Sequence, residues 1–164
     1  MASIIIVWDK RAAIPGGPSS KPGESNVLRV TCDGTTSLSA LTIKILNAAG
    51  QDKIEVLRIF AHGGSSQGGE VALTKDRLSK NNLAAFATPL AGHFTEEGRI
   101  ELHSCLVGKN GTTVSSDSWI FLSYLAIASR AYVYAAEELQ VVFSAEPWDP
   151  DWEGNVLIFP PTGA

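Results

Sequence analysis

The chain has 164 residues, of which 45% are hydrophobic, and it carries 13 basic and 17 acidic residues. This length and apolar content suffice for one substantial core, so we predict a single domain over residues 1–164. The formal net charge of -4 offers no general attraction to nucleic acid or to an anionic membrane surface. We therefore expect neither of these as a partner.

The hydrophobic segments are too short to cross a membrane. None approaches the roughly 20 residues that a spanning helix needs, and residues 2–8 lack the basic start and the length of a signal peptide. We therefore expect the chain to be soluble and cytoplasmic. We also expect Cys32 and Cys105 to stay reduced, because a domain of this size without an export signal seldom depends on disulfides.

The first third of the chain predicts two strands and a helix. Residues 3–8 are strongly β-branched and predict a buried strand that ends at Asp9. A loop rich in proline and glycine follows, and residues 26–32 predict the second strand. Residues 38–48 place their apolar side chains on one helix face, with a capping Thr-Ser pair before them and Gly50 to end the helix.

Two later apolar strands each end on a reactive side chain. Residues 54–61 run into His62, and residues 99–103 run into Ser104 and Cys105. Strands this rich in Ile, Val, Leu and Phe are typical of neighbours in a parallel sheet that is covered on both faces. The ligand crevice of such a sheet lies at the carboxyl ends of its strands. We therefore expect His62 and Cys105 to meet there, as a base beside a nucleophilic thiol.

The remaining segments continue the alternation of strands and helices. Residues 83–94 keep helical spacing, although Pro89 must kink that helix or begin a new one. The pattern predicts a nearly all-apolar helix over residues 119–130, a strand over 132–136 and a last strand over 155–159. This order predicts an α/β fold, a three-layer αβα sandwich around a mostly parallel central sheet of about six strands.

The two strand ends also carry a resemblance to a known family. The motif at residues 60–63 (Phe-Ala-His-Gly) and the later one at 102–105 (Leu-His-Ser-Cys) resemble those of the caspase-haemoglobinase fold of clan CD cysteine peptidases. The resemblance covers roughly residues 54–159, and residues 4–9 are similar to the family's first strand. It implies a caspase-like domain of bacterial type and a cysteine endopeptidase. It argues against papain-like enzymes, in which cysteine precedes histidine.

The resemblance implies roles for individual residues. Cys105 would be the nucleophile and His62 the general acid/base of a His-Cys dyad. The backbone amides of Cys105 and Gly63 would form the oxyanion hole that holds the tetrahedral intermediate, and a side chain at position 63 would hinder the substrate carbonyl. A peptide or protein would be the substrate. We predict no cofactor and no catalytic metal, because the histidines and cysteines do not form a dense ligand spacing.

Three further residues are candidates for substrate binding. Asp9 ends the first strand and Glu137 follows residues 132–136, so both carboxylates would lie at the same edge as Cys105. A pocket floored by a partly desolvated carboxylate favours Arg or Lys. His103 is expected on the same strand face as Cys105, as a pocket residue or a competing base.

Two other functions are open for this pattern. The chain is short for an active peptidase of this type, so a non-catalytic caspase-like scaffold or interaction domain is one alternative. A thiol redox sensor, in which Cys105 is oxidised rather than acylated, is the other. The oligomeric state is also open: if residues 155–159 form an edge strand, they can pair with a second copy or with a partner protein.

Overall fold

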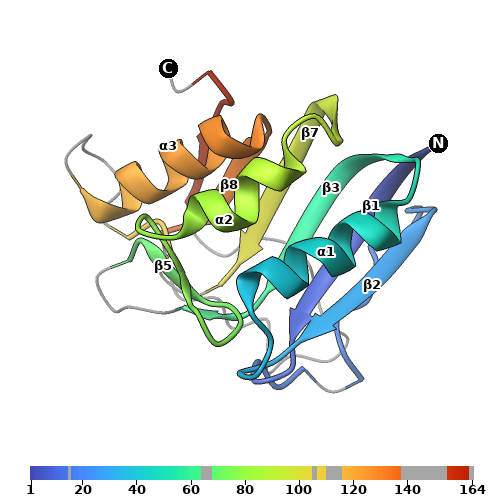
Figure 1. The fold of residues 1–164 in the computed structure, drawn as a ribbon, viewed down its shortest axis with the longest axis horizontal. Coiled ribbons are helices and arrows are strands. Elements are labelled where there is room, and N and C mark those ends of the chain that lie inside the picture. Colours follow the sequence, from blue (N-terminus) through green and yellow to red (C-terminus); the bar gives the residue numbers. More distant parts are fainter. Residues whose placement is uncertain (15, 64–67, 105–106, 110–115, 138–154, 163–164) are drawn as a thin grey trace.

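The structure is a computed structural model that describes residues 1–14, 16–63, 68–104, 107–109, 116–137 and 155–162. Its central feature is a six-stranded sheet with the order β2-β1-β3-β7-β8-β9 (Figure 1). These strands are β1 Ala2–Asp9, β2 Val27–Cys32, β3 Lys53–Phe60, β7 Phe94–His103, β8 Tyr132–Ala136 and β9 Val156–Phe159. β9 runs antiparallel to β8, and every other neighbouring pair is parallel. The predicted α/β fold with a mostly parallel sheet of six strands is confirmed.

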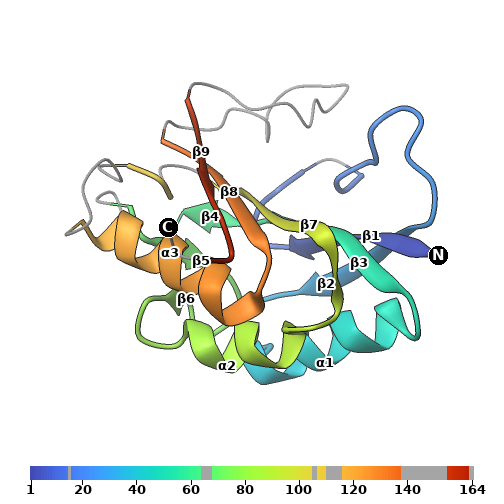
Figure 2. The same cartoon turned by 90° about the horizontal axis from the view of Figure 1, so that it is seen from above.

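The helices of the described residues lie on one face of this sheet (Figure 2). They are α1 Leu38–Ala49, α2 Leu83–Ala87, the 3-10 helix η1 Thr88–Leu90 and α3 Asp117–Ser129. Their buried side chains share one apolar core with alternate strand residues such as Val7, Ile59 and Leu102. A second helical layer is not found in the described ranges, so the three-layer arrangement stays a prediction. No described helix is long and apolar enough to cross a membrane.

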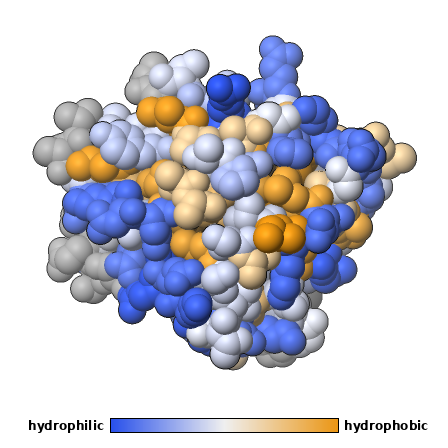
Figure 3. Space-filling view, in the orientation of Figure 1, coloured by the Kyte–Doolittle hydropathy of each residue, from blue (hydrophilic) through white to orange (hydrophobic). Residues whose placement is uncertain are grey.

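The surface of the helical face mixes apolar patches with hydrophilic side chains (Figure 3). Its exposed large apolar residues on α1 and α3 are Ile43, Tyr124 and Ile127. Hydrophilic groups separate the apolar patches in this view, so this face is not one continuous apolar surface.

Local signals set the helix ends. Ser37 caps α1 by accepting a hydrogen bond from the backbone N of Ala40, and Gly50 ends the helix with a φ of 60°. Pro89 lies in η1, which begins directly after α2, so the helical segment breaks there as Pro requires. The predicted continuation of this helix to Phe94 is wrong. Phe94 begins β7 because it pairs with Ile54 of β3, and this sheet contact outweighs the local spacing.

The opposite face of the sheet carries polar as well as apolar side chains. Phe60 packs there with Ile6 and with Ile14 of the chain that connects β1 to β2. The buried Arg58 lies on the same face and binds Glu24 of that connection. Figure 2 shows the connection on the side of the sheet away from the helices. These contacts hold it over the carboxyl half of β1 and β3.

A second, three-stranded sheet begins directly after β3. It has the order β4-β5-β6 and is formed by β4 His62–Gly63, β5 Glu70–Ala72 and β6 Leu78–Ser79. The strands are antiparallel, with His62 paired to Ala72 and Gly63 paired to Val71. The chain therefore leaves the central sheet just before His62. The backbone of His62 is then held by its pairing with β5.

Candidate active site

β3 and β7 are neighbouring parallel strands, as the sequence predicted. Their last paired residues are Phe60 and His103, whose rings stack with centroids 4.8 Å apart and an interplanar angle of 22°. His62 lies just beyond this pair on the β3 side, and Ser104 lies beyond it on the β7 side. Cys105 lies outside the described residues. The adjacency of the two strand ends is thus confirmed, and the meeting of His62 with Cys105 stays a prediction.

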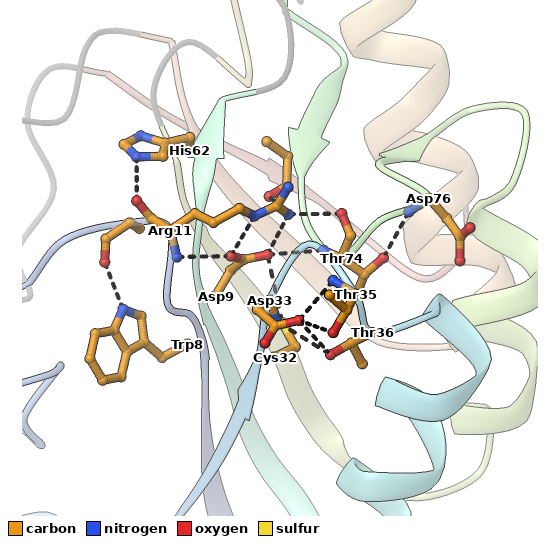
Figure 4. A network of polar contacts seen from close by, with 12 residues as sticks. Trp8, Asp9, Arg11, Cys32, Asp33, Thr35, Thr36, His62, Thr74 and Asp76 are labelled. Carbon is orange, nitrogen blue, oxygen red and sulfur yellow. Dashed lines mark hydrogen bonds and ion pairs between the residues drawn. The ribbon is translucent and has the colours of Figure 1, made fainter.

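The imidazole of His62 is exposed and has a defined direction. Its Nε2 atom lies 2.9 Å from the backbone carbonyl oxygen of Arg11 (Figure 4). A carbonyl oxygen only accepts hydrogen bonds, so Nε2 is the donor and carries the hydrogen. In the neutral ring the lone pair then belongs to Nδ1. Nδ1 is therefore the nitrogen of His62 that can take up a proton.

Arg11 is held by contacts that the sequence reasoning missed. Its Nε and Nη2 atoms donate to the two carboxylate oxygens of Asp9 at 2.9 and 2.7 Å. Nη2 also donates to the carbonyl oxygens of Ala72 and Thr74 at 3.1 and 2.8 Å. Figure 4 shows Arg11 between His62 and Asp9, with its carbonyl toward the imidazole and its guanidinium toward the carboxylate. The side chain thus ties the end of β1 to the strand that pairs with His62.

The turn after β1 has a partial signal in the sequence. In an Asx turn, the side chain of Asp accepts a hydrogen bond from the backbone N–H two residues later. Here the backbone N of Arg11 donates to Asp9 Oδ1 at 3.1 Å. The indole Nε1 of Trp8 closes the turn by donating to the carbonyl oxygen of Ala12 at 2.7 Å. The partners of Arg11 on residues 72 and 74 have no such signal, because they are distant in the sequence.

Asp9 is not placed as a pocket carboxylate. Its side chain is buried with an exposed fraction of 0%, and Oδ2 also accepts a hydrogen bond from the backbone N of Thr74 at 3.0 Å. Burial alone would raise the pKa of Asp9, but the hydrogen bonds from Arg11 and Thr74 outweigh burial and lower it below its ordinary value. The carboxylate is already paired with Arg11. This geometry therefore gives no support to the prediction that Asp9 binds a substrate cation.

Cys32 is a structural thiol. It is 3% exposed, its sulfur lies 3.8 Å from Asp9 Oδ2, and it forms no disulfide. Burial and the neighbouring Asp9 carboxylate raise the pKa of Cys32 to about 12. The thiolate is the reactive form of cysteine, so Cys32 has almost none of it at neutral pH.

His103 lies beneath the strand end rather than in a pocket. It is fully buried against Phe60, and its Nε2 atom lies 3.1 Å from Glu101 Oε2. Burial lowers the pKa of His103 below its ordinary value, although the neighbouring Glu101 acts in the opposite direction. This placement gives no support to the expectation that His103 lines the substrate pocket, because its side chain has no exposed surface.

A group of charged side chains lies beside His103 on this face of the sheet, with Arg58 and Glu101 buried and Arg99 partly exposed. Arg58 Nε donates to Glu101 Oε2 at 2.8 Å, and Arg99 Nε donates to Glu101 Oε1 at the same distance. The other two guanidinium nitrogens of Arg58 bind the carboxylate of Glu24 at 3.1 and 2.8 Å. Burial would raise the pKa of Glu101, but the hydrogen bond from His103 and the charge of Arg58 lower it well below its ordinary value. The carboxylate is therefore ionised at neutral pH.

Glu137 keeps its place as a candidate for substrate binding. It follows β8, the neighbour of β7, and the register of these strands puts it level with Ser104. It is half-buried, and Asn155 Nδ2 donates to its Oε2 at 3.4 Å. β1 lies three strand spacings from β8, which is about 14 Å at about 4.8 Å a spacing. Glu137 and Asp9 therefore do not gather at one point of the edge.

No family model, curated protein or solved structure matches the chain. The described residues contain no group of three or more His, Cys, Asp or Glu side chains that could hold a metal ion. The function of the chain is therefore inferred from the strand ends and from the residues that orient His62.

Proposed function

We propose that the chain is a caspase-like cysteine endopeptidase in which His62 is the general base and Cys105 the nucleophile. The observation that carries this proposal is the pairing of Phe60 with His103, because it brings the strand ends before His62 and Cys105 side by side. The fixed imidazole of His62 supports it further, since a general base must be held in one direction. We retain the three-layer caspase-like sandwich as the proposed fold.

The reaction follows from the roles of these residues. His62 takes the thiol proton of Cys105 on Nδ1, and the thiolate attacks the carbonyl carbon of the scissile peptide. The backbone N–H groups of Gly63 and Cys105 stabilise the oxyanion of the tetrahedral intermediate. The imidazolium then protonates the leaving amine, and water hydrolyses the thioester with His62 again as the base. The Arg11 carbonyl accepts the Nε2 hydrogen throughout and holds the ring in one direction.

The positions of Asp9 and Glu137 limit which carboxylate can bind an Arg or Lys of the substrate. A preference for Arg or Lys cannot depend on Asp9, because Arg11 already neutralises that carboxylate. Glu137 is the candidate that remains for contact with a substrate cation, next to the end of β7. Cleavage of a peptide library by the wild type and by Glu137→Gln would measure this preference.

Covalent labelling tests the dyad. We expect a peptidyl electrophile to label Cys105 rapidly at neutral pH, and His62→Ala to slow that labelling by about 100-fold or more, the usual contribution of a positioned base. Peptide mass spectrometry separates Cys105 from Cys32, which is the internal control and should stay unlabelled because its pKa is raised to about 12. His93→Ala is the matched control, since it removes an exposed histidine at the opposite edge of the sheet.

Other outcomes of the labelling would favour the other functions. Slow labelling of Cys105, equal to that of Cys32 and insensitive to His62→Ala, would remove the peptidase and favour a non-catalytic scaffold. Rapid reaction of Cys105 with peroxide without any reaction with the peptidyl probe would instead favour a thiol sensor.

A further inference from the structure

We infer that the ion pair of the buried Asp9 with the partly exposed Arg11 is a positioning device that holds the Arg11 carbonyl against His62, and so fixes the tautomer and the direction of the imidazole. The catalytic meaning of this inference rests on the proposed function. The contacts themselves do not, because they connect residues whose positions the structure describes (Figure 4). Asp9 and Arg11 are thus positioning residues and not groups that touch the substrate.

The direction of the Arg11 carbonyl follows from the planarity of one peptide unit. This carbonyl belongs to the peptide that joins Arg11 to Ala12, and in a trans peptide the C=O and N–H groups point in opposite directions. The backbone N of Ala12 donates to the carbonyl oxygen of Asp9 at 2.9 Å. The Arg11 carbonyl therefore points away from Asp9 and toward His62 Nε2, which lies 2.9 Å from it.

The side chain of Arg11 keeps this peptide in place. Asp9 holds its guanidinium with two hydrogen bonds and its backbone N with a third. Two parallel bonds from a guanidinium to a carboxylate define an orientation as well as a distance. The carboxylate itself is fully buried and is anchored by the backbone N of Thr74. A turn held in this way cannot rotate without breaking several charged hydrogen bonds.

The same side chain also positions the backbone of His62. Arg11 Nη2 donates to the carbonyl oxygen of Ala72, and Ala72 is the residue of β5 that pairs with His62. Arg11 therefore contacts the histidine by two routes, directly through its carbonyl and indirectly through β5. Arg11, Ala72 and His62 are thus linked to one another in a closed loop of contacts. A shift of the turn after β1 would therefore move the imidazole of His62 relative to β4.

The device predicts a defined state of His62 that can be measured without activity. We expect the Cys105→Ala protein to show, in ¹⁵N NMR in mildly alkaline buffer, a protonated Nε2 and an unprotonated Nδ1 on His62. Arg11→Met in this background should move the two ¹⁵N shifts toward each other, because both tautomers become populated. In the protein with Cys105 intact, Arg11→Met should lower kcat by about 10- to 100-fold with little change in KM, as for a misplaced base.

The control is Arg77→Met, which removes the ion pair between Arg77 and Glu70 of β5. This substitution leaves the contacts of Arg11 described above in place. It should leave the His62 shifts unchanged. If Arg11→Met does not fold, Arg11→Lys replaces it in the test. Lysine keeps a positive charge beside Asp9 but lacks the planar guanidinium that forms two parallel hydrogen bonds. The side chain of Arg11 is 42% exposed, so a lysine at this position keeps access to solvent. Shifts of His62 that stay unchanged in the folded Arg11 variant would overturn the inference. Because this readout needs no turnover, it separates a failure of the positioning device from a failure of the peptidase.

Discussion

Cys105→Ala is expected to abolish peptide hydrolysis while leaving the fold intact. Removal of the attacking atom of a catalytic pair typically lowers kcat by about 10⁴-fold or more. Cys32 cannot replace it, since that thiol is buried and its pKa is raised to about 12. Turnover of a peptide library by the purified variant, with near-UV circular dichroism to compare the fold, measures this effect.

The matched control for this substitution is Cys32→Ala. It removes the other thiol of the chain, and the proposed reaction makes no use of that thiol, so peptide turnover should persist. Residual turnover of Cys105→Ala above about 1% of the wild-type rate would contradict the role of Cys105, because a missing nucleophile leaves far less activity. An equal loss in Cys32→Ala would contradict it too.

The largest loss of stability is expected at Arg58. Its guanidinium is fully buried, and Arg58→Met leaves Glu101 without one of its two arginine partners. It also leaves Glu24 without its ion pair, although the backbone N of Lys21 still donates to Glu24 Oε2. Breaking a buried pair from one side typically costs about 3–5 kcal/mol of the free energy of unfolding. Urea denaturation of both proteins measures the difference. Arg29→Met, at an exposed arginine of β2, is the control and should change it by less than about 1 kcal/mol.

Acid should reduce the difference in the free energy of unfolding between the wild type and Arg58→Met. Burial opposes ionisation of Glu101, yet its contacts with His103 and Arg58 lower its pKa in the folded protein below the ordinary 4.5. A lowered pKa contributes stability that is fully present above the unfolded value and is lost as the pH falls through the folded value. The gap between wild type and Arg58→Met should therefore shrink below about pH 4.5. A gap no larger than that of Arg29→Met at neutral pH would refute the role of the pair.

The elements with strong local signals were predictable from the sequence. The strands before His62 and Cys105 are runs of β-branched and large apolar residues, and such runs are typical of buried parallel strands. Ser37 and Gly50 mark the ends of α1 because a hydroxyl cap and a positive φ are local requirements. The start of β7 at Phe94 was missed, since the pairing of Phe94 with Ile54 depends on a strand far away in the sequence.

The candidate site was predictable only where it depends on strand order. The sequence placed Asp9 at a strand end, but its burial and its pairing depend on Arg11 and on Thr74, which lies in the turn between β5 and β6. His103 was expected as a pocket residue or a competing base, because nothing local shows that it stacks on Phe60 and binds Glu101. A signal was nevertheless present: Arg58 and Glu101 place opposite charges within the apolar segments 56–60 of β3 and 100–102 of β7, and the register places them side by side.

The distance between the sulfur of Cys105 and Nδ1 of His62 in a crystal structure tests the dyad most directly. We expect about 4 Å or less, with His62 Nε2 still on the Arg11 carbonyl, because a nucleophile and its base must come within reach of a hydrogen bond. A sulfur that points into the apolar core, or one more than about 7 Å from the imidazole, would contradict the proposal, since no proton could then pass between the two.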